Sequence, residues 1–369
     1  MLTEIHIDNF RCLVNFDLKL DRLNLLLGDN GGGKTAVFEA LRRLQGFLGG
    51  AINVDAAFPS QDLTRWQQLD VQHFELAMKV GDDVYTYALS IEHDHDRRCR
   101  QIKHEDLWMN LKPLFGFEAG TAQLYDDGFK AGPQYLFDPS RSGIAALQGR
   151  PDNRLLTRFH QQMGKLVIVS LCPVHMAFES AEEERQLTPL GDNFASWYRY
   201  LSQEHQGNIL ELTQQLRLVL PGFDSFSLRE AGEKTRVLKV LFGSGGQAQK
   251  AIAYNFDELS DGQRQLIVLY CLLYGIKGEG YSLFLDEPDN YVALREIQPW
   301  LTSLQDACGE SISQAVLISH HPEIIDYLAG SAGRWFDRPD NGATRVLDKV
   351  PPPADGLKTS ETIARGWTS

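Results

Sequence analysis

Residues 28–35 read Gly28-Asp29-Asn30-Gly31-Gly32-Gly33-Lys34-Thr35, a complete G-x-x-x-x-G-K-[ST] loop. The loop follows an apolar run at residues 23–27 and precedes a stretch with helical periodicity at residues 35–44. A strand, a glycine-rich turn and a helix N-terminus in this order direct backbone N–H groups and the positive end of a helix dipole at phosphate. The sequence therefore predicts a nucleotide-binding site built on a strand–loop–helix unit.

The residues of this loop have separate expected roles. Asn30, Gly31 and Gly33 belong to the phosphate cradle, in which glycine lets the backbone approach the ligand closely. Lys34 is long enough to reach the β- and γ-phosphates, and the Thr35 hydroxyl is a ligand for Mg²⁺. We therefore expect ATP or GTP, together with Mg²⁺, as the cofactors.

A second element of a nucleotide site lies at residues 283–287, which read Leu-Phe-Leu-Asp-Glu. A hydrophobic strand that ends in Asp places a carboxylate beside the phosphate loop, so Asp286 is expected to hold Mg²⁺ directly or through water. Glu287 is then positioned to orient or deprotonate the attacking water. Alone, the acidic pair is a weak signal, because many strands end in solvated acids; with Lys34 upstream it becomes a strong one.

Residues 259–263, Leu-Ser-Asp-Gly-Gln, open a predicted helix and match the L-S-x-G-Q signature of ABC-type ATPases. Ser260 is a favourable helix N-cap, and its hydroxyl, the Gly262 amide and the helix dipole can receive a γ-phosphate. The resemblance implies that Ser260, Gly262 and Gln263 meet nucleotide bound to another subunit. It also implies that His320, after the predicted strand that follows Asp286, is the switch histidine, whereas His321 is structural or faces solvent.

The order of these elements, with Asn9-Phe10-Arg11 near the start, resembles the RecF/SMC-like ABC ATPases. This group includes the overcoming-lysogenization-defect (OLD) proteins and compact predicted ATPases of AAA type. The resemblance also rests on Asp286-Glu287-Pro288 and Ser319-His320-His321-Pro322, and covers residues 1–45 and 255–330; it is weaker in the middle, where residues 190–194 resemble a G-x-N-L element. It implies ATP as the nucleotide, Arg11 near it, and Asp289 and Asn290 in a D-loop. The expected fold is an α/β ABC-type P-loop ATPase head with a mixed or parallel core sheet, an antiparallel N-terminal β region and a compact α+β insertion.

We expect four segments along the chain: 1–45 with the N-terminal β region and P-loop, 46–250 with ABC lobe elements and the compact insertion or helical lobe, 251–345 with the remaining motifs, and a tail at 346–369. Local patterns further predict a hairpin at 74–91, irregular structure at 115–153, a buried strand at 166–171, a helical segment at 192–219 and strands at 226–242. The last core block is predicted as helix 259–275, strand 281–285, helix 293–307 and strand 315–319. No sustained heptads occur, so long coiled-coil arms are not expected.

Composition narrows the function classes. The 369 residues carry a formal net charge of −13, which argues against a broadly basic nucleic-acid binder but leaves a local groove open. Two basic clusters favour solvated surface over such a groove: Arg97, Arg98, Arg100 and Lys103, and then Arg150, Arg154 and Arg158. No apolar run approaches 18 residues and the five cysteines are scattered, which favours a reduced cytoplasmic compartment without membrane insertion.

Two weaker patterns leave alternatives open. Gln61, Gln67 and Gln68 are candidates for a glutamine loop, although glutamine in such a stretch is usually polar surface. His93 and His95 could share a strand face and ligate a metal, but the polar end of a hairpin is the favoured interpretation.

The resulting hypothesis is an ATP hydrolase that works as an ATP-sandwich homodimer or higher oligomer. It would couple its nucleotide state to a separate effector protein, such as a nuclease in phage defence or DNA repair. The alternative is a slow nucleotide-dependent switch, scaffold or DNA-binding protein with little turnover. A transporter ATPase is disfavoured by the Asn9-Phe10-Arg11 start and the unplaced glutamine loop. The sequence leaves DNA binding and the identity of the effector open.

Overall fold

The computed structural model describes residues 1–94, 99–243, 251–347, 350 and 356–365. They form two compact units, each built from two stretches of chain. Unit 1 combines Met1–Leu166 with Gly333–Val350, and unit 2 combines Val167–Ala332 with Pro351–Ser369. None of the helices in these described ranges is long and apolar enough to cross a membrane.

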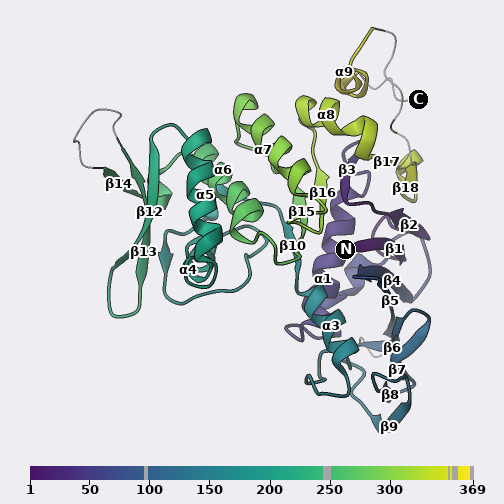
Figure 1. The fold of residues 1–369 in the computed structure, drawn as a ribbon. Helices are drawn as coiled ribbons and strands as arrows, with labels where there is room; N and C mark the ends of the chain where they lie inside the picture. Colours follow the sequence, from purple (N-terminus) through teal and green to yellow (C-terminus); the bar gives the residue numbers. More distant parts are fainter. Residues whose placement is uncertain (95–98, 244–250, 348–349, 351–355, 366–369) are drawn as a thin grey trace. The chain divides into compact units, whose positions relative to one another are not determined.

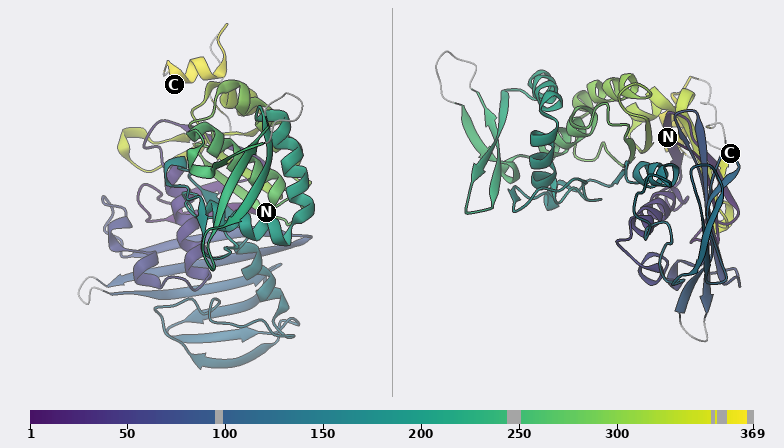
Figure 2. Two further views of the ribbon diagram at one scale, coloured as in Figure 1. Left: turned by 90° about the vertical axis from the view of Figure 1, so that its left-hand side faces the viewer. Right: turned by 60° about the horizontal axis from the view of Figure 1, so that its bottom comes forward.

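Unit 1 is organised around an eight-stranded antiparallel sheet (Figures 1 and 2). In spatial order its strands are β2 (Phe16–Lys19), β1 (Leu2–Asp8), β4 (Val71–Val80), β5 (Asp83–Asp94), β6 (Cys99–Met109), β7 (Lys112–Glu118), β8 (Thr121–Tyr125) and β9 (Ala131–Leu136). Phe74 and Leu76 on β4 are buried while Glu75 between them is exposed, because successive strand residues face opposite sides. The hairpin predicted at residues 74–91 is confirmed as β4 and β5.

Three helices cover the apolar face of this sheet: α1 (Lys34–Leu48), α2 (Val54–Ala57) and α3 (Arg154–Met163), with a 3₁₀ turn, η1 (Ser60–Asp62), after α2. Aromatic pairs join the layers. The Phe58 ring lies 5.5 Å from Phe47 and 5.1 Å from Phe74, and Phe159 lies 5.7 Å from Tyr87. Edge-to-face and tilted pairs of this kind add to the apolar burial that holds helices on a sheet. The helix expected at residues 35–44 is confirmed and extends to Leu48.

The prediction of irregular structure at residues 115–153 is wrong for its first part, where β7, β8 and β9 continue the sheet. The glycines and acids there occupy tight turns instead of a long loop. Ala119 (φ 49°) and Gly120 (φ 79°) form the turn between β7 and β8, while Phe115 and Phe117 are buried on the apolar face. Residues 137–153 contain no helix or strand, as expected.

A buried acid ties part of this irregular segment to the sheet. Glu105 on β6 is fully buried, and its Oε1 accepts hydrogen bonds from Tyr87 Oη at 3.1 Å and Ser142 Oγ at 2.5 Å. Its Oε2 accepts one from the Gly143 N–H at 2.8 Å. Burial raises the pKa of this carboxyl to about 7 against the opposing effect of the donors, since a low-dielectric surrounding disfavours the charged form.

The P-loop strand of unit 1, β3 (Leu23–Gly28), pairs in parallel with β17 (Gly333–Asp337), and β17 pairs antiparallel with β18 (Arg345–Leu347). A short 3₁₀ turn, η5 (Pro339–Asn341), connects the last two strands. Gly28 has a φ of 139°, and a Cβ there would lie 2.2 Å from the Phe336 carbonyl oxygen. Only glycine therefore allows β17 to approach the strand at the point where the P-loop begins.

Unit 2 contains β10 (Leu166–Val169), β15 (Ser282–Asp286) and β16 (Gln314–Ile318), adjacent in that order, with β15 and β16 parallel. Its helices here are α6 (Asp261–Tyr270), which continues as a π-helical turn (Cys271–Gly275), α7 (Leu294–Ala307) and α8 (Pro322–Ala332) (Figure 1). Trp300 of α7 is fully buried and donates its indole N–H to the Leu269 carbonyl of α6 at 3.2 Å. The strands and helices predicted from 259 to 319 are confirmed, with boundaries that differ by at most five residues.

The rest of unit 2 is a small antiparallel sheet with two helices. It comprises β11 (Glu179–Ser180), β12 (Phe223–Glu230), β13 (Arg236–Phe242), β14 (Ile252–Asn255), α4 (Phe194–Glu204) and α5 (Gln206–Val219). Phe194 packs on Phe256 with ring centroids 4.7 Å apart. The helical prediction for 192–219 is confirmed, except that the helix breaks at His205 (φ −125°, ψ 50°). Within the tail, α9 (Thr359–Ala364) is held on α8 by two hydrogen bonds from Ser360 to Asp326.

Candidate nucleotide site

The P-loop of unit 1 has the backbone that its glycines predict. Gly31 (φ 81°) and Gly33 (φ 98°) adopt left-handed conformations that other residues reach only with strain. Lys34, 5% exposed, donates hydrogen bonds from Nζ to the carbonyls of Gly28 at 2.6 Å and Asp29 at 3.0 Å. The ammonium group therefore lies over the loop itself, where the phosphates of a nucleotide would be cradled.

The outer side of the loop is open to solvent. Asn30, Gly31 and Thr35 are exposed, and Thr35 is the second residue of α1. At the first turn of a helix the backbone N–H groups lack intrahelical partners, so they are free to bind an anion. The Thr35 hydroxyl and the Asp286 carboxylate are hard oxygen donors, the type that Mg²⁺ prefers, and thus fit that ion chemically.

The C-terminal part of unit 1 supports the P-loop through two hydrogen bonds to its backbone carbonyls. Thr344 is fully buried and donates its hydroxyl to the Gly32 carbonyl at 3.0 Å. Arg338 donates from Nη1 to the Gly31 carbonyl at 3.0 Å. Both residues lie more than 300 positions from the loop they support. Sequence reasoning missed them, because no local pattern signals a partner at that distance.

The Asn9-Phe10-Arg11 element shapes the loop at residues 62–71. Asn9 is buried with a φ of 60°; its amide donates to the carbonyls of Leu69 at 2.7 Å and Val71 at 3.0 Å and accepts from the Thr64 N–H at 3.1 Å. Arg11 Nε donates to Asp62 Oδ1 at 2.8 Å, in the same unit as the P-loop. A direct contact between Arg11 and nucleotide remains a prediction.

The glutamine candidates lie on this same loop. Gln61 and Gln68 are exposed and Gln67 is half-buried, and all three line an open cavity of about 520 Å³. Sequence reasoning overlooked Gln72, which is fully buried and donates from Nε2 to the Asn9 carbonyl at 3.0 Å. Its burial and hydrogen bonds make it a structural residue of the sheet.

In unit 2, the acids and the histidine follow the carboxyl ends of two adjacent parallel strands. Asp286 ends β15 opposite Ile318 of β16, and the Glu287 N–H donates to the Ile318 carbonyl at 2.8 Å. His320, two residues further on, is exposed. In parallel sheets this edge is where ligands bind, so the arrangement brings Asp286, Glu287 and His320 to one chemically suitable edge.

Glu287 is held in an unusual conformation. Its φ is 51°, and its Oε2 accepts a hydrogen bond from Asn290 Nδ2 at 2.7 Å. A non-glycine residue in the left-handed region costs free energy and is maintained by its surroundings. The turn at residues 287–290 therefore fixes the direction of the Glu287 carboxylate.

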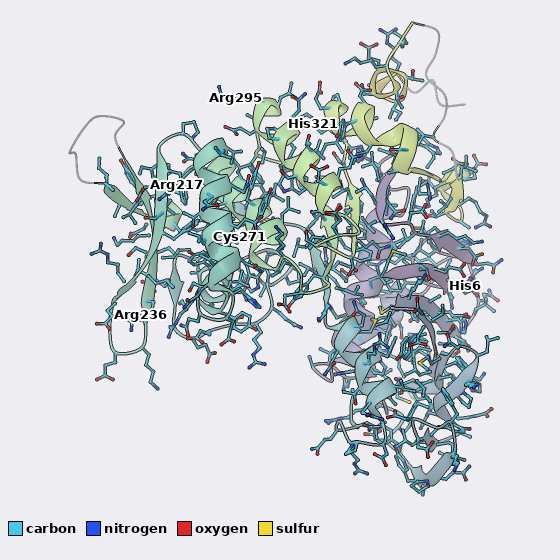
Figure 3. All side chains as sticks on the ribbon, in the orientation of Figure 1. His6, Arg217, Arg236, Cys271, Arg295 and His321 are labelled. Atoms are coloured by element: carbon cyan, nitrogen blue, oxygen red, sulfur yellow. The ribbon has the colours of Figure 1, made fainter. Side chains whose placement is uncertain are left out.

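The neighbouring residues Asp289 and His321 have structural contacts. Burial raises the pKa of the Asp289 carboxyl, and a hydrogen bond with Ser319 opposes that change. The Ser319 hydroxyl also accepts from the His321 N–H at 3.0 Å. His321 (labelled in Figure 3) accepts the Glu323 N–H on Nδ1 at 3.2 Å, at the start of α8, which agrees with its expected structural role.

The signature residues form the N-terminus of α6. Ser260 is an exposed N-cap whose Oγ accepts the Gln263 N–H at 3.3 Å, and Gln263 Oε1 accepts the Ser260 N–H at 3.1 Å. This reciprocal pair is a capping box. A Cβ on Gly262 would lie 2.6 Å from the Tyr291 carbonyl oxygen, so glycine allows the D-loop to pack against the signature. Gln265 strengthens the contact by donating to the Pro288 carbonyl at 3.0 Å.

The remaining candidates are the histidine pair and the two basic clusters. The described part of the chain has no group of three or more His, Cys, Asp or Glu residues arranged to hold a metal ion. His95, Asp96, Arg97 and Arg98 lie outside the described residues. Four of the five described cations in the two basic clusters have ion pairs: Arg100 with Asp55, Lys103 with Glu92, Arg154 with Asp127 and Arg158 with Asp83. These pairs agree with the interpretation as solvated surface.

Two sequence comparisons relate parts of the chain to known proteins. Residues 1–103 match the family model of the AAA ATPase domain. An OLD nuclease from Thermus scotoductus is 28% identical over 132 residues, which are 35% of this chain and 23% of that protein. The chain therefore matches about a quarter of the length of this relative.

Solved structures extend the likeness to the whole fold. An SMC head bound to the C-terminal winged-helix domain of ScpA has a TM-score of 0.56 at 10% identity, with 94% of this chain and 97% of that chain covered. An SMC head with an extended coiled coil, bound to the C-terminal domain of ScpA derived from Pyrococcus furiosus, has a TM-score of 0.53 at 11% identity, with 99% and 98% covered. At this identity the likeness concerns the fold, which is that of an ABC-type P-loop ATPase head. The chain is thus similar to RecF/SMC-like ABC ATPases: its first 103 residues match an AAA ATPase domain, part of it matches an OLD protein, and its fold is that of an ABC-type P-loop ATPase head.

Proposed function

We propose that the protein hydrolyses ATP. The observation that carries this proposal is the edge formed by Asp286, Glu287 and His320 at the ends of two hydrogen-bonded parallel strands. The same chain carries a P-loop whose Lys34 already lies over the loop carbonyls. A phosphate cradle and an acid–histidine edge are the parts that phosphoryl transfer to water requires.

Each residue has a role that follows from its chemistry. The P-loop N–H groups and Lys34 bind the phosphates and stabilise negative charge on the γ-phosphoryl group. The Glu287 carboxylate, directed by Asn290, orients the attacking water and accepts its proton, and His320 donates a hydrogen bond to the γ-phosphate. Thr35 and Asp286 would hold Mg²⁺, which when bound supplies additional positive charge at the phosphate oxygens.

The complete site is proposed to need two subunits. Ser260, Gly262 and Gln263 sit at an exposed or half-exposed helix N-terminus, where the dipole favours an anion. We assign this N-terminus to the γ-phosphate of nucleotide bound by another copy of the chain. ATP would then close a homodimer and hydrolysis would open it, since the γ-phosphate contacts both subunits.

The biological output is proposed to be control of a separate effector. The OLD relative is named a nuclease, and the match covers 23% of its length. Our proposal is therefore that this ATPase, a cytoplasmic protein, acts with a nuclease in phage defence or DNA repair. DNA is a second candidate ligand of the dimer.

Turnover of ATP by wild-type protein and by Glu287→Gln tests the enzymatic proposal. The amide keeps the size of the side chain but cannot accept the proton, so we expect at least a tenfold lower rate with ATP binding retained. The variant should also accumulate ATP-bound dimers in size-exclusion chromatography. Glu310→Gln, in an exposed turn, is the matched control. Equal rates for wild type and Glu287→Gln would favour the alternative, a slow switch or scaffold.

A separate experiment tests the effector. The tagged protein is purified after expression with its native genomic neighbours, with ATP present, and the proteins that copurify are identified. A nuclease retained by wild type and released by Lys34→Ala would support the proposal. Recovery of no nuclease, together with ATP turnover that DNA does not change, would contradict it.

A further inference from the structure

An exposed tryptophan lies next to the P-loop within unit 1. Trp66 is 48% exposed although the guanidinium carbon of Arg338 lies 5.7 Å from its ring centroid. Arg338 also donates to the Gly31 carbonyl of the P-loop at 3.0 Å. A single guanidinium group therefore connects the tryptophan ring to the turn that would cradle phosphate.

The guanidinium group is fixed in place. In addition to the Gly31 contact, its Nε donates to the Gly342 carbonyl at 2.9 Å and its Nη2 donates to the Asn341 carbonyl at 2.9 Å. All three nitrogens are thus engaged with main-chain carbonyls. A planar group with three such bonds loses its rotational freedom, so it holds the ring contact in one geometry.

The loop that carries Trp66 is also held from both ends. Asn9 binds Thr64 on one side of the tryptophan and Leu69 and Val71 on the other. Residues adjacent to Trp66 in sequence, Arg65 and Gln67, line the open cavity of about 520 Å³. This volume falls in the range of small-molecule sites, roughly 300–1,000 Å³. Neither the ATPase motifs nor the proposed mechanism uses this tryptophan.

We propose that Trp66, oriented by Arg338, stacks against the base of the nucleoside triphosphate whose phosphates occupy the P-loop. The inference rests on the proposed nucleotide site and adds its base-binding part. A tryptophan presents a large flat surface to a purine, and its partial exposure leaves ring area available to the ligand. Because Arg338 and the loop are already held in place, little conformational freedom is lost on binding, which favours affinity.

Binding of two ligands to the full-length protein separates base stacking from phosphate binding. The ligands are ATP, in the presence of Mg²⁺, and inorganic tripolyphosphate, which has the phosphates but no base. We expect Trp66→Ala to weaken ATP binding roughly tenfold, the size of a lost base–aromatic stack. Its affinity for tripolyphosphate should stay within about twofold of wild type. Trp66→Phe should recover most of the ATP affinity, because the phenyl ring still stacks.

Leu136→Ala is the matched control, since this leucine is 86% exposed on β9 of the same unit and should change neither affinity. Equal losses for ATP and tripolyphosphate in Trp66→Ala would overturn the inference, because the tryptophan would then only support the P-loop. Unchanged ATP affinity would overturn it as well. If wild-type protein binds neither ligand, the proposed nucleotide function itself is wrong, so the two failures are distinguishable.

Discussion

Gly262→Ala is the perturbation for which the structure gives the most definite expectation. The added Cβ would lie 2.6 Å from the Tyr291 carbonyl oxygen, whereas ordinary contacts begin at 3.4 Å. The backbone on one side must therefore move by about 0.4 Å to reach the shortest distance that real Cβ atoms show, 3.0 Å, and by about 0.8 Å to reach an ordinary contact. The obstacle is a main-chain atom, so no flexible side chain can turn away to relieve the clash.

The D-loop is the side expected to move, and its movement reaches Glu287, the proposed general base. Tyr291 already has a left-handed backbone (φ 71°), and Gln265 binds the Pro288 carbonyl. Asn290, next to Tyr291, holds the Glu287 carboxylate at 2.7 Å. A displaced Tyr291 would pull on this hydrogen bond. The signature residue Gly262 and the proposed general base, Glu287, are thus connected through a chain of contacts within one subunit.

The magnitude follows from these distances. Overpacking a rigid contact costs typically 1–3 kcal/mol, so the unfolding free energy should fall by about that amount. A misplacement of about 1 Å at a reacting group can cost on the order of a hundredfold in rate. We expect kcat for ATP to fall between roughly tenfold and a hundredfold. ATP affinity should stay near wild type, because Lys34 and the P-loop lie in the other unit.

Steady-state ATPase assays, ATP binding and urea unfolding without nucleotide are the measurements. Gly330→Ala is the control, because Gly330 lies inside α8 with no atom within 4 Å of the added Cβ. It should keep full activity and gain slightly in stability, as alanine favours helices. A Gly262→Ala protein with wild-type stability but low activity would place the defect in the partner's phosphate contact instead. Wild-type turnover would refute the reasoning entirely.

Three further predictions follow from single contacts. Asn290→Ala should reduce kcat about two- to tenfold without weakening ATP binding, since Glu287 loses an exposed hydrogen bond worth roughly 0.5–1.5 kcal/mol. Steady-state assays measure kcat, and stopped-flow measurements give the rate and strength of ATP binding. Thr344→Val keeps the shape of the side chain but removes the hydroxyl that donates to the Gly32 carbonyl. The free energy of unfolding, measured in urea, should fall by about 1–3 kcal/mol. An unchanged unfolding midpoint would argue that water replaces the hydroxyl. The pKa of Glu105 in the folded protein, about 7, exceeds its ordinary value of 4.5. Protonation of this carboxyl therefore stabilises the fold, fully below pH 4.5. The contribution, roughly 3 kcal/mol, is lost as the pH rises to 7 and above. Glu105→Gln should flatten that part of the pH dependence of unfolding, and a slope equal to wild type would contradict it.

The sequence predicted best those parts of the fold that local periodicity encodes. The alternation from Phe74 to Ile91 and the apolar runs of β15 and β16 were enough to place strands. Prediction failed at residues 115–136, where Gly, Pro and Asp residues are interspersed among the apolar ones. There the few buried side chains, such as Phe115 and Phe117, gain their stability from helix packing across the sheet, which composition alone does not reveal.

The candidate site also divides into residues that the sequence predicts and residues that only the structure reveals. The P-loop, the signature and the acid pair are contiguous in sequence, because each uses consecutive backbone groups to face a ligand. The residues that hold them are distant: Thr344 and Arg338 support the P-loop through side chain-to-carbonyl bonds across more than 300 positions. A hydrogen bond to a carbonyl places no demand on the local sequence of the acceptor. Such residues are therefore visible only in the structure.

The capping box at Ser260 determines which hydrogen bonds must change if a phosphate binds there. The Ser260 hydroxyl accepts from the Gln263 N–H and lies 3.1 Å from Gln263 Oε1, to which it can donate its only proton. A phosphate offers acceptors alone, so the hydroxyl must turn that proton from Gln263 to the phosphate. Gln263 Oε1 would still accept the Ser260 N–H, so no buried group is left unpaired. This exchange would replace a neutral hydrogen bond by a charge-assisted one of about twice the strength. In the proposed dimer it would therefore favour closure only when the γ-phosphate is present.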